Sequence, residues 1–240
     1  MAIVIGGGIQ IGSGISIDAS AAGLVLDGLT LHLDPANTAS YSGSGSTWTD
    51  LAGTADNITL VNSPTYTSGT PSYFTFNGST QYGTGSGTGV VPTTAYTKNF
   101  WMYLNAYFDN NFVSSGTGGH FIFMGSSTNR IYSGHANWNT LGGTYLDYPS
   151  TATISLSTWY NVCLTFNTTD GMTLYLNGAQ DSTYTARKNA HAGNGSTNIA
   201  TFSGGNLLNG RLGQVFCYNR ALTATEVLQN YNSTRSRYGI

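Results

Sequence analysis

The stretch that decides the fold is WYNVCLTFNTTDGMTLYLNGAQDSTYT, residues 159–185. Apolar residues alternate with small or polar ones along its first part, as in a strand with one buried face: Val162, Leu164 and Phe166. Asp-Gly at 170–171 and Asn-Gly at 177–178 are tight-turn pairs, because glycine readily adopts the positive φ that such turns need. We therefore predict an antiparallel three-stranded meander over these residues.

Similar strand-like segments, separated by clusters of Gly, Asn, Ser or Pro, occur at residues 24–33, 72–82, 100–108, 119–125 and 210–219. In the first of them the leucines are expected on one face, with an irregularity at Gly28: Leu24, Leu26, Leu29, Leu31 and Leu33. Many short strands without helical runs between them predict an all-β antiparallel sandwich or barrel.

One helix is predicted, close to the C-terminus. Thr223-Ala224-Thr225-Glu226 is a capping box, in which the Thr223 hydroxyl and the Glu226 carboxylate each accept from the other residue's backbone N–H. Val227, Leu228 and Tyr231 follow on a helical period. A helix of two to three turns is marginal by itself, so it is expected to dock on the sandwich.

Residues 1–22 form a separate Gly/Ile-rich β arm, and residues 23–240 form the domain. The arm contains two and a half copies of I-x-I-G-x-G, with its isoleucines at regular positions: Ile3, Ile5, Ile9, Ile11, Ile15 and Ile17. A solenoid needs at least about three repeats to bury a continuous core. We expect the arm to bury its isoleucines against sister chains or a larger particle; the alternative is a loose tail.

The composition excludes several functions. Charged residues are 8% of the chain, against about 25% in an average soluble domain, and the net charge is −2. The sequence has no basic stripe for nucleic acid and no run of about 18 apolar residues for membrane insertion. No Lys or Arg precedes Lys98, so no signal peptide is expected and the protein is predicted to be made in a cytoplasm. Two free, buried thiols are expected at Cys163 and Cys217.

Four segments together resemble the laminin-G-like branch of the concanavalin A-like lectin/glucanase superfamily. They are LDPANTASYSGSGSTWTDLAG (33–53), FTFNGSTQY (74–82), STWYNVCLTFNTTDGMTLYLNGA (157–179) and NGRLGQVFCYNRALTATEVLQNYNST (209–234). The resemblance implies a jelly-roll sandwich of two antiparallel sheets that usually acts as a binding module. Related domains occur in phage structural proteins, and resemblance to phage fibres and decoration proteins favours a homo-trimer.

The resemblance alone does not decide between an enzyme and a lectin. Glycosidases of this fold carry paired Glu residues, and a retaining mechanism needs two carboxylates about 5–5.5 Å apart. This chain has a single glutamate, Glu226, inside the capping box, while its aspartates are isolated: Asp109, Asp147, Asp170 and Asp181. We therefore predict no catalytic residues and no enzymatic activity.

Metal binding is also not predicted, although laminin-G-like domains often bind calcium. The four histidines lack metal-ligand spacing: His32, His120, His135 and His191. Asp34, Asp50 and Asp56 are the only clustered carboxylates. Turn formation at Asp34-Pro35 and at Asp50 is preferred to a calcium site.

The best candidate for ligand binding is SGHANWNTLGGTYLDY, residues 133–148. A lectin site combines an aromatic platform with amide or carboxylate partners on a loop. The candidate residues are His135, Asn137, Trp138, Asn139, Tyr145 and Tyr148. The competing interpretation is that the aromatics pack the loop onto the sheet. Packing is the preferred interpretation for Trp48, Trp101 and Trp159.

Taken together, the sequence predicts a bacteriophage virion protein, either a capsid decoration or fibre protein or a tail-fibre component. It would display a lectin-like domain for host-surface or environmental glycans and would contact the major capsid protein or a tail protein. A free-standing lectin is the first alternative, and an unconventional glycan hydrolase is the second.

Overall fold

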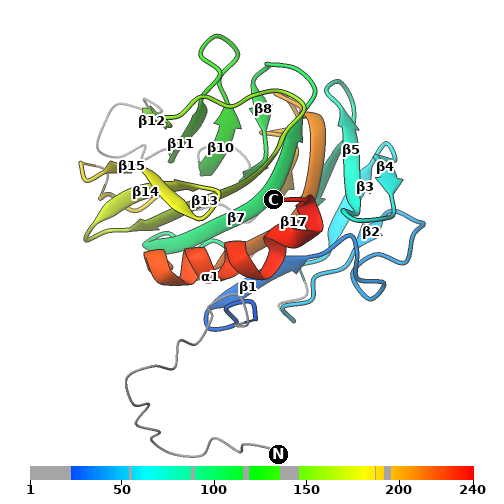
Figure 1. Ribbon diagram of the computed structural model, residues 1–240, viewed down its shortest axis with the longest axis horizontal. Helices are drawn as coiled ribbons and strands as arrows, with labels where there is room; N and C mark the ends of the chain where they lie inside the picture. The colour runs from blue at the N-terminus through cyan, green and yellow to red at the C-terminus, as the bar shows by residue number, and fades with distance from the viewer. Residues whose placement is uncertain are drawn as a thin grey trace, which may run out of the picture.

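The computed structural model describes residues 23–53, 56–87, 90–115, 119–135, 146–186, 188–191 and 196–240. The predicted N-terminal arm and the loop residues Asn137, Trp138, Asn139 and Tyr145 lie outside these ranges. The described chain is an all-β sandwich with one α-helix near the C-terminus, as predicted (Figure 1). No helix within it has the length and apolar character needed to cross a membrane.

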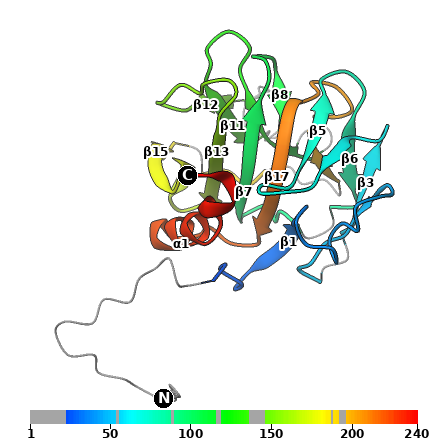
Figure 2. The same ribbon diagram turned by 45° about the vertical axis from the view of Figure 1, so that its right-hand side comes forward.

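The larger layer is an eight-stranded antiparallel sheet. Its main path runs β15 (Ala179–Tyr184), β14 (Gly171–Leu176), β13 (Trp159–Asn167), β7 (Ala95–Leu104), β17 (Asn209–Tyr218), β5 (Tyr73–Asn77) and β4 (Thr65–Thr67), and β1 (Leu29–Leu33) also pairs with β17. The β13–β14–β15 meander confirms the prediction for residues 159–185. Long strands β7 and β17 lie side by side at the centre of the sheet (Figure 2).

The facing layer is divided into two smaller sheets. One contains β2 (Thr47–Trp48), β3 (Ile58–Val61), β6 (Tyr82–Gly85), β16 (Thr197–Ile199) and β9 (Val113–Ser114). The other contains β12 (Leu146–Pro149), β11 (Ile131–His135), β10 (His120–Met124) and β8 (Asn110–Asn111). Only Phe112 separates β8 from β9, so the chain passes directly from one small sheet to the other.

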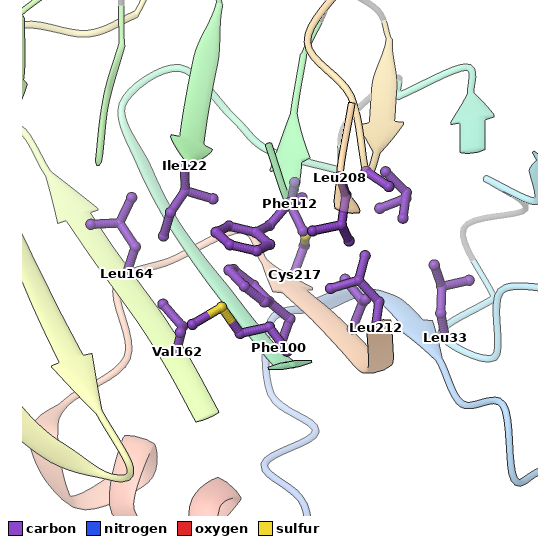
Figure 3. Close-up of a cluster of buried hydrophobic side chains, with 14 of the residues drawn as sticks. Leu33, Phe100, Phe112, Ile122, Val162, Leu164, Leu208, Leu212 and Cys217 are labelled. Atoms are coloured by element: carbon purple, nitrogen blue, oxygen red, sulfur yellow. The ribbon is translucent and has the colours of Figure 1, made fainter. Parts of the chain in front are cut away.

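The main core fills the space between the layers. The Phe100 and Phe112 rings, from β7 and the β8–β9 junction, stack with centroids 5.1 Å apart (Figure 3). Leu164 from β13 and Ile122 from β10 lie beside them, fully buried. Burial of one such side chain stabilises the fold by about 1.5–3 kcal/mol. Cys163 and Cys217 are free and buried, as predicted.

The C-terminal segment lies across the outer face of the larger sheet. Helix α1 (Ala224–Thr234) is followed by a 3-10 turn, η2 (Arg235–Tyr238), over β7 and β17 (Figure 1). The Thr223–Glu226 capping box is present, as predicted. Val227 packs against Phe216 and Tyr218, which point away from the main core. The helix therefore buries a second apolar layer on the back of the sheet.

Three strand predictions need correction. The strand predicted at residues 72–82 is divided between β5 and β6, because the Asn77 side-chain oxygen accepts from the Ser79 and Thr80 N–H groups in a turn between them. The first strand covers only Leu29–Leu33 rather than residues 24–33, because Gly28 has a φ of +76° in a turn where the Leu29 N–H donates to the Leu26 carbonyl. The Leu26 side chain is 72% exposed. The strand predicted at residues 100–108 instead spans 95–104, and Phe108 is 61% exposed beyond its end.

Candidate functional site

The described part of the predicted binding segment consists of β11, β12 and the positions beside them. His135 is fully buried, with Nδ1 3.3 Å from the Tyr96 hydroxyl and Nε2 2.7 Å from the Asn189 carbonyl oxygen. Its ring faces the interior rather than a surface where a ligand would bind. Tyr148 is half-buried on β12 and stacks on Tyr184, with centroids 4.2 Å apart. Of the predicted site residues, the structure thus describes His135 as interior and Tyr148 as packed against Tyr184.

A buried polar cluster lies beneath this end of the sandwich. The Tyr96 ring lies within 5.8–6.4 Å, centroid to centroid, of three imidazoles: His120, His135 and His191. Lys98, on the same face of β7, is fully buried and donates to the Val113 carbonyl oxygen over 3.1 Å. Burial lowers the pKa of Lys98 to about 7 and that of His191 to about 4. The pKa of His120 is also lowered, so at neutral pH both His120 and His191 are uncharged.

The aspartates considered for calcium each make their own hydrogen bonds. An Asp34 oxygen accepts from the Ala36 N–H, and an Asp50 oxygen accepts from the Ala52 N–H, which confirms the predicted turns. Asp56 accepts from the Ser86 hydroxyl and the Gly87 N–H. Among the residues that the structure describes, no three His, Cys, Asp or Glu side chains converge as metal ligands. Each of these aspartates thus supports a turn or a loop contact.

The single glutamate has a structural role. Both Glu226 carboxylate oxygens accept from Arg220, at 2.6 and 2.9 Å, and one of them also accepts from the Thr223 N–H at 2.8 Å. The Arg220 guanidinium is the main cause that lowers the pKa of Glu226 to about 2. A carboxylate held ionised and bonded in this way is unsuited to act as a general acid.

A group of aromatic residues that the sequence analysis missed lies on the outer face of the larger sheet. We define the outer-face platform as Tyr73 on β5, Tyr103 on β7, Trp159 on β13 and Arg211 on β17. Strand pairing places them together, because Tyr103 is the register partner of both Trp159 and Arg211. All four side chains are half-buried, whereas Trp48 and Trp101 are fully buried, as predicted.

The contacts within the platform form a closed ring. The Trp159 ring lies 5.6 Å from the Tyr73 ring and 5.6 Å from the Tyr103 ring, between centroids. The Arg211 guanidinium carbon lies 4.8 Å from the Tyr73 centroid and 4.2 Å from the Tyr103 centroid. Each tyrosine therefore touches both the indole and the cation. These cation–π contacts hold the guanidinium between two rings.

Amide side chains and a small pocket border the platform. Asn77, Asn105 and Asn209 occupy the next row of outward positions, where Asn209 pairs with Asn77 in register and its side-chain oxygen accepts from the Asn105 amide over 3.3 Å. On another side, Tyr238 contacts Trp159 at 4.9 Å between centroids. Tyr238 also lines a pocket of about 130 Å³ with Asp34, Thr70, Pro71, Ser72 and Arg237.

The described chain is thus an antiparallel sandwich with a C-terminal helix docked on its larger sheet. A model of the concanavalin A-like lectin/glucanases superfamily matches residues 76–228, and the chain belongs to this superfamily. No curated protein matches the sequence.

Solved structures show the same fold at low identity. The binding domain of Paraclostridial Mosquitocidal Protein 1 is 19% identical with a TM-score of 0.69. The matched region includes 87% of this chain and 52% of that one. The binding domain of botulinum neurotoxin DC, in complex with rat synaptotagmin II, is 14% identical with a TM-score of 0.65 and the same coverage. This chain thus spans about half the length of the structures it resembles.

Proposed function

We propose that the domain is a non-catalytic carbohydrate-binding module whose ligand stacks on the outer-face platform. The observation that carries this proposal is the closed ring of Tyr73, Tyr103, Trp159 and Arg211 on a half-exposed sheet face. The apolar face of a sugar ring packs well on aromatic side chains that are already held in place. The neighbouring asparagine amides supply donors and acceptors for sugar hydroxyls.

Membership of the superfamily and the nature of the neighbours support a binding role. One structural neighbour is from botulinum neurotoxin type C, whose cell entry depends on interaction with two ganglioside molecules; it is 13% identical, with a TM-score of 0.66. Gangliosides are glycolipids, and the region matched by this chain makes up 52% of that neighbour's chain. The capping role of Glu226 argues against hydrolysis by the paired-carboxylate route.

A glycan array with matched tryptophan variants tests the proposal. We expect the full chain to bind a subset of glycans and Trp159→Ala to lose that binding, while Trp138→Ala retains it. Because Trp159 lies on the outer face of the sheet and is only half-buried, its loss should leave the far-ultraviolet circular dichroism spectrum, which reports the backbone, unchanged. Loss of binding in Trp138→Ala alone would place the site in the 136–145 loop. Absence of binding to every glycan would contradict the carbohydrate role.

We further propose that the domain is displayed on a phage virion by the arm at residues 1–22. The support is the I-x-I-G-x-G repeat, whose regularly spaced isoleucines are expected to need an apolar partner, together with the low charge of the chain. In a homo-trimer held together by its arms and bound to a capsid or tail protein, these isoleucines would be buried.

Deletion of residues 1–22 tests this second proposal. The truncated chain should be a folded monomer by light scattering and should no longer enter virus particles, and Ile9→Ser with Ile11→Ser should have the same effect. A truncated chain that keeps the oligomeric state of the full chain and still binds particles would show that the arm is a passive tail.

A further inference from the structure

We propose that the outer-face platform selects acidic sugars, and that Arg211 binds the carboxylate or sulfate group of the ligand. This inference rests on the proposed carbohydrate-binding function and specifies its ligand class. It starts from the charge of Arg211, which no described residue neutralises.

The other arginines that lie near carboxylates are paired with them. Among the described residues, Arg220 pairs with Asp27 at 2.9 Å and with Glu226 at 2.6 Å, and Arg237 pairs with Asp34 at 2.7 Å. The Arg211 side chain forms no ion pair and no hydrogen bond with the described residues, and its Nε atom is buried without an acceptor. The Nη1 and Nη2 donors of the guanidinium therefore have no acceptor among the described residues.

The position of Arg211 is fixed although its donors are unused. The two tyrosine rings at 4.2 and 4.8 Å stabilise the cation but supply neither a carboxylate nor a carbonyl acceptor. An anion that accepts hydrogen bonds from the Nη atoms of the guanidinium supplies the partner that the described residues do not. A planar guanidinium suits a carboxylate or sulfate, because it donates two parallel hydrogen bonds to such a group.

The arrangement of the ring also suits a sugar that carries the anion. The Tyr103 ring contacts both the Trp159 indole and the Arg211 guanidinium. A pyranose stacked on the indole would therefore lie beside Tyr103, on the side of the platform that also holds the guanidinium. The chain as a whole carries a net charge of −2, so general electrostatic attraction does not favour anions. Selectivity for acids must therefore come from this local cation.

Titration calorimetry with matched probes tests the proposal. The probes are sialyllactose, lactose and a sulfated lactose, which share one core and differ in their acidic group. We expect the full chain to bind at least one acidic probe ten-fold or more tightly than lactose, with an advantage that shrinks as salt rises. Comparison of the two acidic probes distinguishes a carboxylate ligand from a sulfate ligand.

Three variants assign the effect to its residues. Arg211→Gln should abolish the ratio by which an acidic probe binds more tightly than lactose, while Trp159→Ala should weaken all three probes and keep that ratio. Arg130→Gln is the matched control, because it removes the same charge on the other layer, where Arg130 donates to the Ser150 carbonyl oxygen. This control variant should leave the affinities of all three probes unchanged.

The possible failures differ from one another. Equal binding of lactose and both acidic probes, or an advantage that survives Arg211→Gln, would overturn the assignment of Arg211 while leaving the carbohydrate role in place. If none of the probes and no array glycan binds, the carbohydrate role fails and this inference fails with it. Binding of an acidic protein surface that depends on Arg211 and is not displaced by sialyllactose would also overturn it.

Discussion

Trp101 and Tyr238 stack almost face to face, with ring centroids 4.0 Å apart and planes 9° from parallel. Trp101 lies on β7, and its indole N–H also donates to the Thr234 hydroxyl over 3.0 Å. The Tyr238 hydroxyl accepts from the Gln214 N–H on β17 over 2.9 Å. These contacts fix η2 on the outer face of the sheet, beside the platform.

We predict that Tyr238→Ala destabilises the protein by about 3 kcal/mol, since it removes a buried aromatic ring and a hydrogen-bond acceptor. Chemical denaturation measures the change. Tyr238→Phe is the control and should cost only about 1 kcal/mol, because the ring stack remains. Equal losses in the two variants would show that the hydroxyl, rather than the stacked ring, holds the segment.

Lys98→Met is predicted to stabilise the protein at pH 7 by about 3 kcal/mol, because removing the charge gains about 4 kcal/mol while the Val113 carbonyl loses its donor at a cost of about 1 kcal/mol. The pKa of Lys98 is lowered to about 7 in the folded chain from 10.5, so at neutral pH the unfolded chain holds a proton that the folded chain binds poorly. The stability of the natural protein therefore falls as pH drops from 10.5 to 7. The gain in Lys98→Met should shrink toward pH 10, and thermal unfolding at both pH values measures it. A constant gain would show that packing, not charge, causes it.

Acid should destabilise the protein through the buried histidines. Burial is the main cause that lowers the pKa of His191 to about 4 and that of His120 well below 6.5, with Lys98 adding to both shifts. Because the unfolded chain binds these protons more readily, stability is complete above pH 6.5 and falls as pH drops toward 4. His191 alone accounts for about 3 kcal/mol, from a shift near 2.5 pH units.

Urea unfolding between pH 7.5 and 4.5 checks this dependence. His191→Gln should flatten the curve, because glutamine does not gain a proton. Stability that stays constant over this range in the natural protein would contradict the burial of neutral imidazoles.

Glu226→Gln should cost about 1 kcal/mol at pH 7, since it weakens the helix cap and the pair with Arg220. The pKa of Glu226 is lowered to about 2, so its contribution is present above pH 4.5 and is lost as pH falls toward 2. The difference in melting temperature between the two proteins should narrow over that range. If Glu226→Gln were unfolded at neutral pH, Glu226 would contribute more to stability than its helix cap and its pair with Arg220 explain.

Local sequence patterns predicted the parts of the fold that depend on nearby residues. The meander follows from Asp-Gly at 170–171 and Asn-Gly at 177–178, and the helix follows from the Thr223–Glu226 box. The burial of Lys98 and His135 could not be predicted, because polar side chains usually indicate an exposed face and only the facing layer encloses these two.

The platform escaped prediction for a different reason. Tyr73, Tyr103, Trp159 and Arg211 come from four strands that are distant in sequence, and only the register of β5, β17, β7 and β13 brings them together. The usable signal was the alternation in each strand, which directs Tyr73 and Trp159 away from buried neighbours such as Phe74 and Val162.

The indole N–H resonances of the four tryptophans provide the most direct test of the central claim. In a ¹⁵N-labelled full chain titrated with an array-selected glycan, we predict that the Trp159 signal shifts with ligand concentration, as assigned with Trp159→Phe. The Trp48 and Trp101 signals should stay in place, because both side chains are fully buried. A saturable shift confined to Trp138, with the Trp159 signal unchanged, would contradict the account of the outer-face platform.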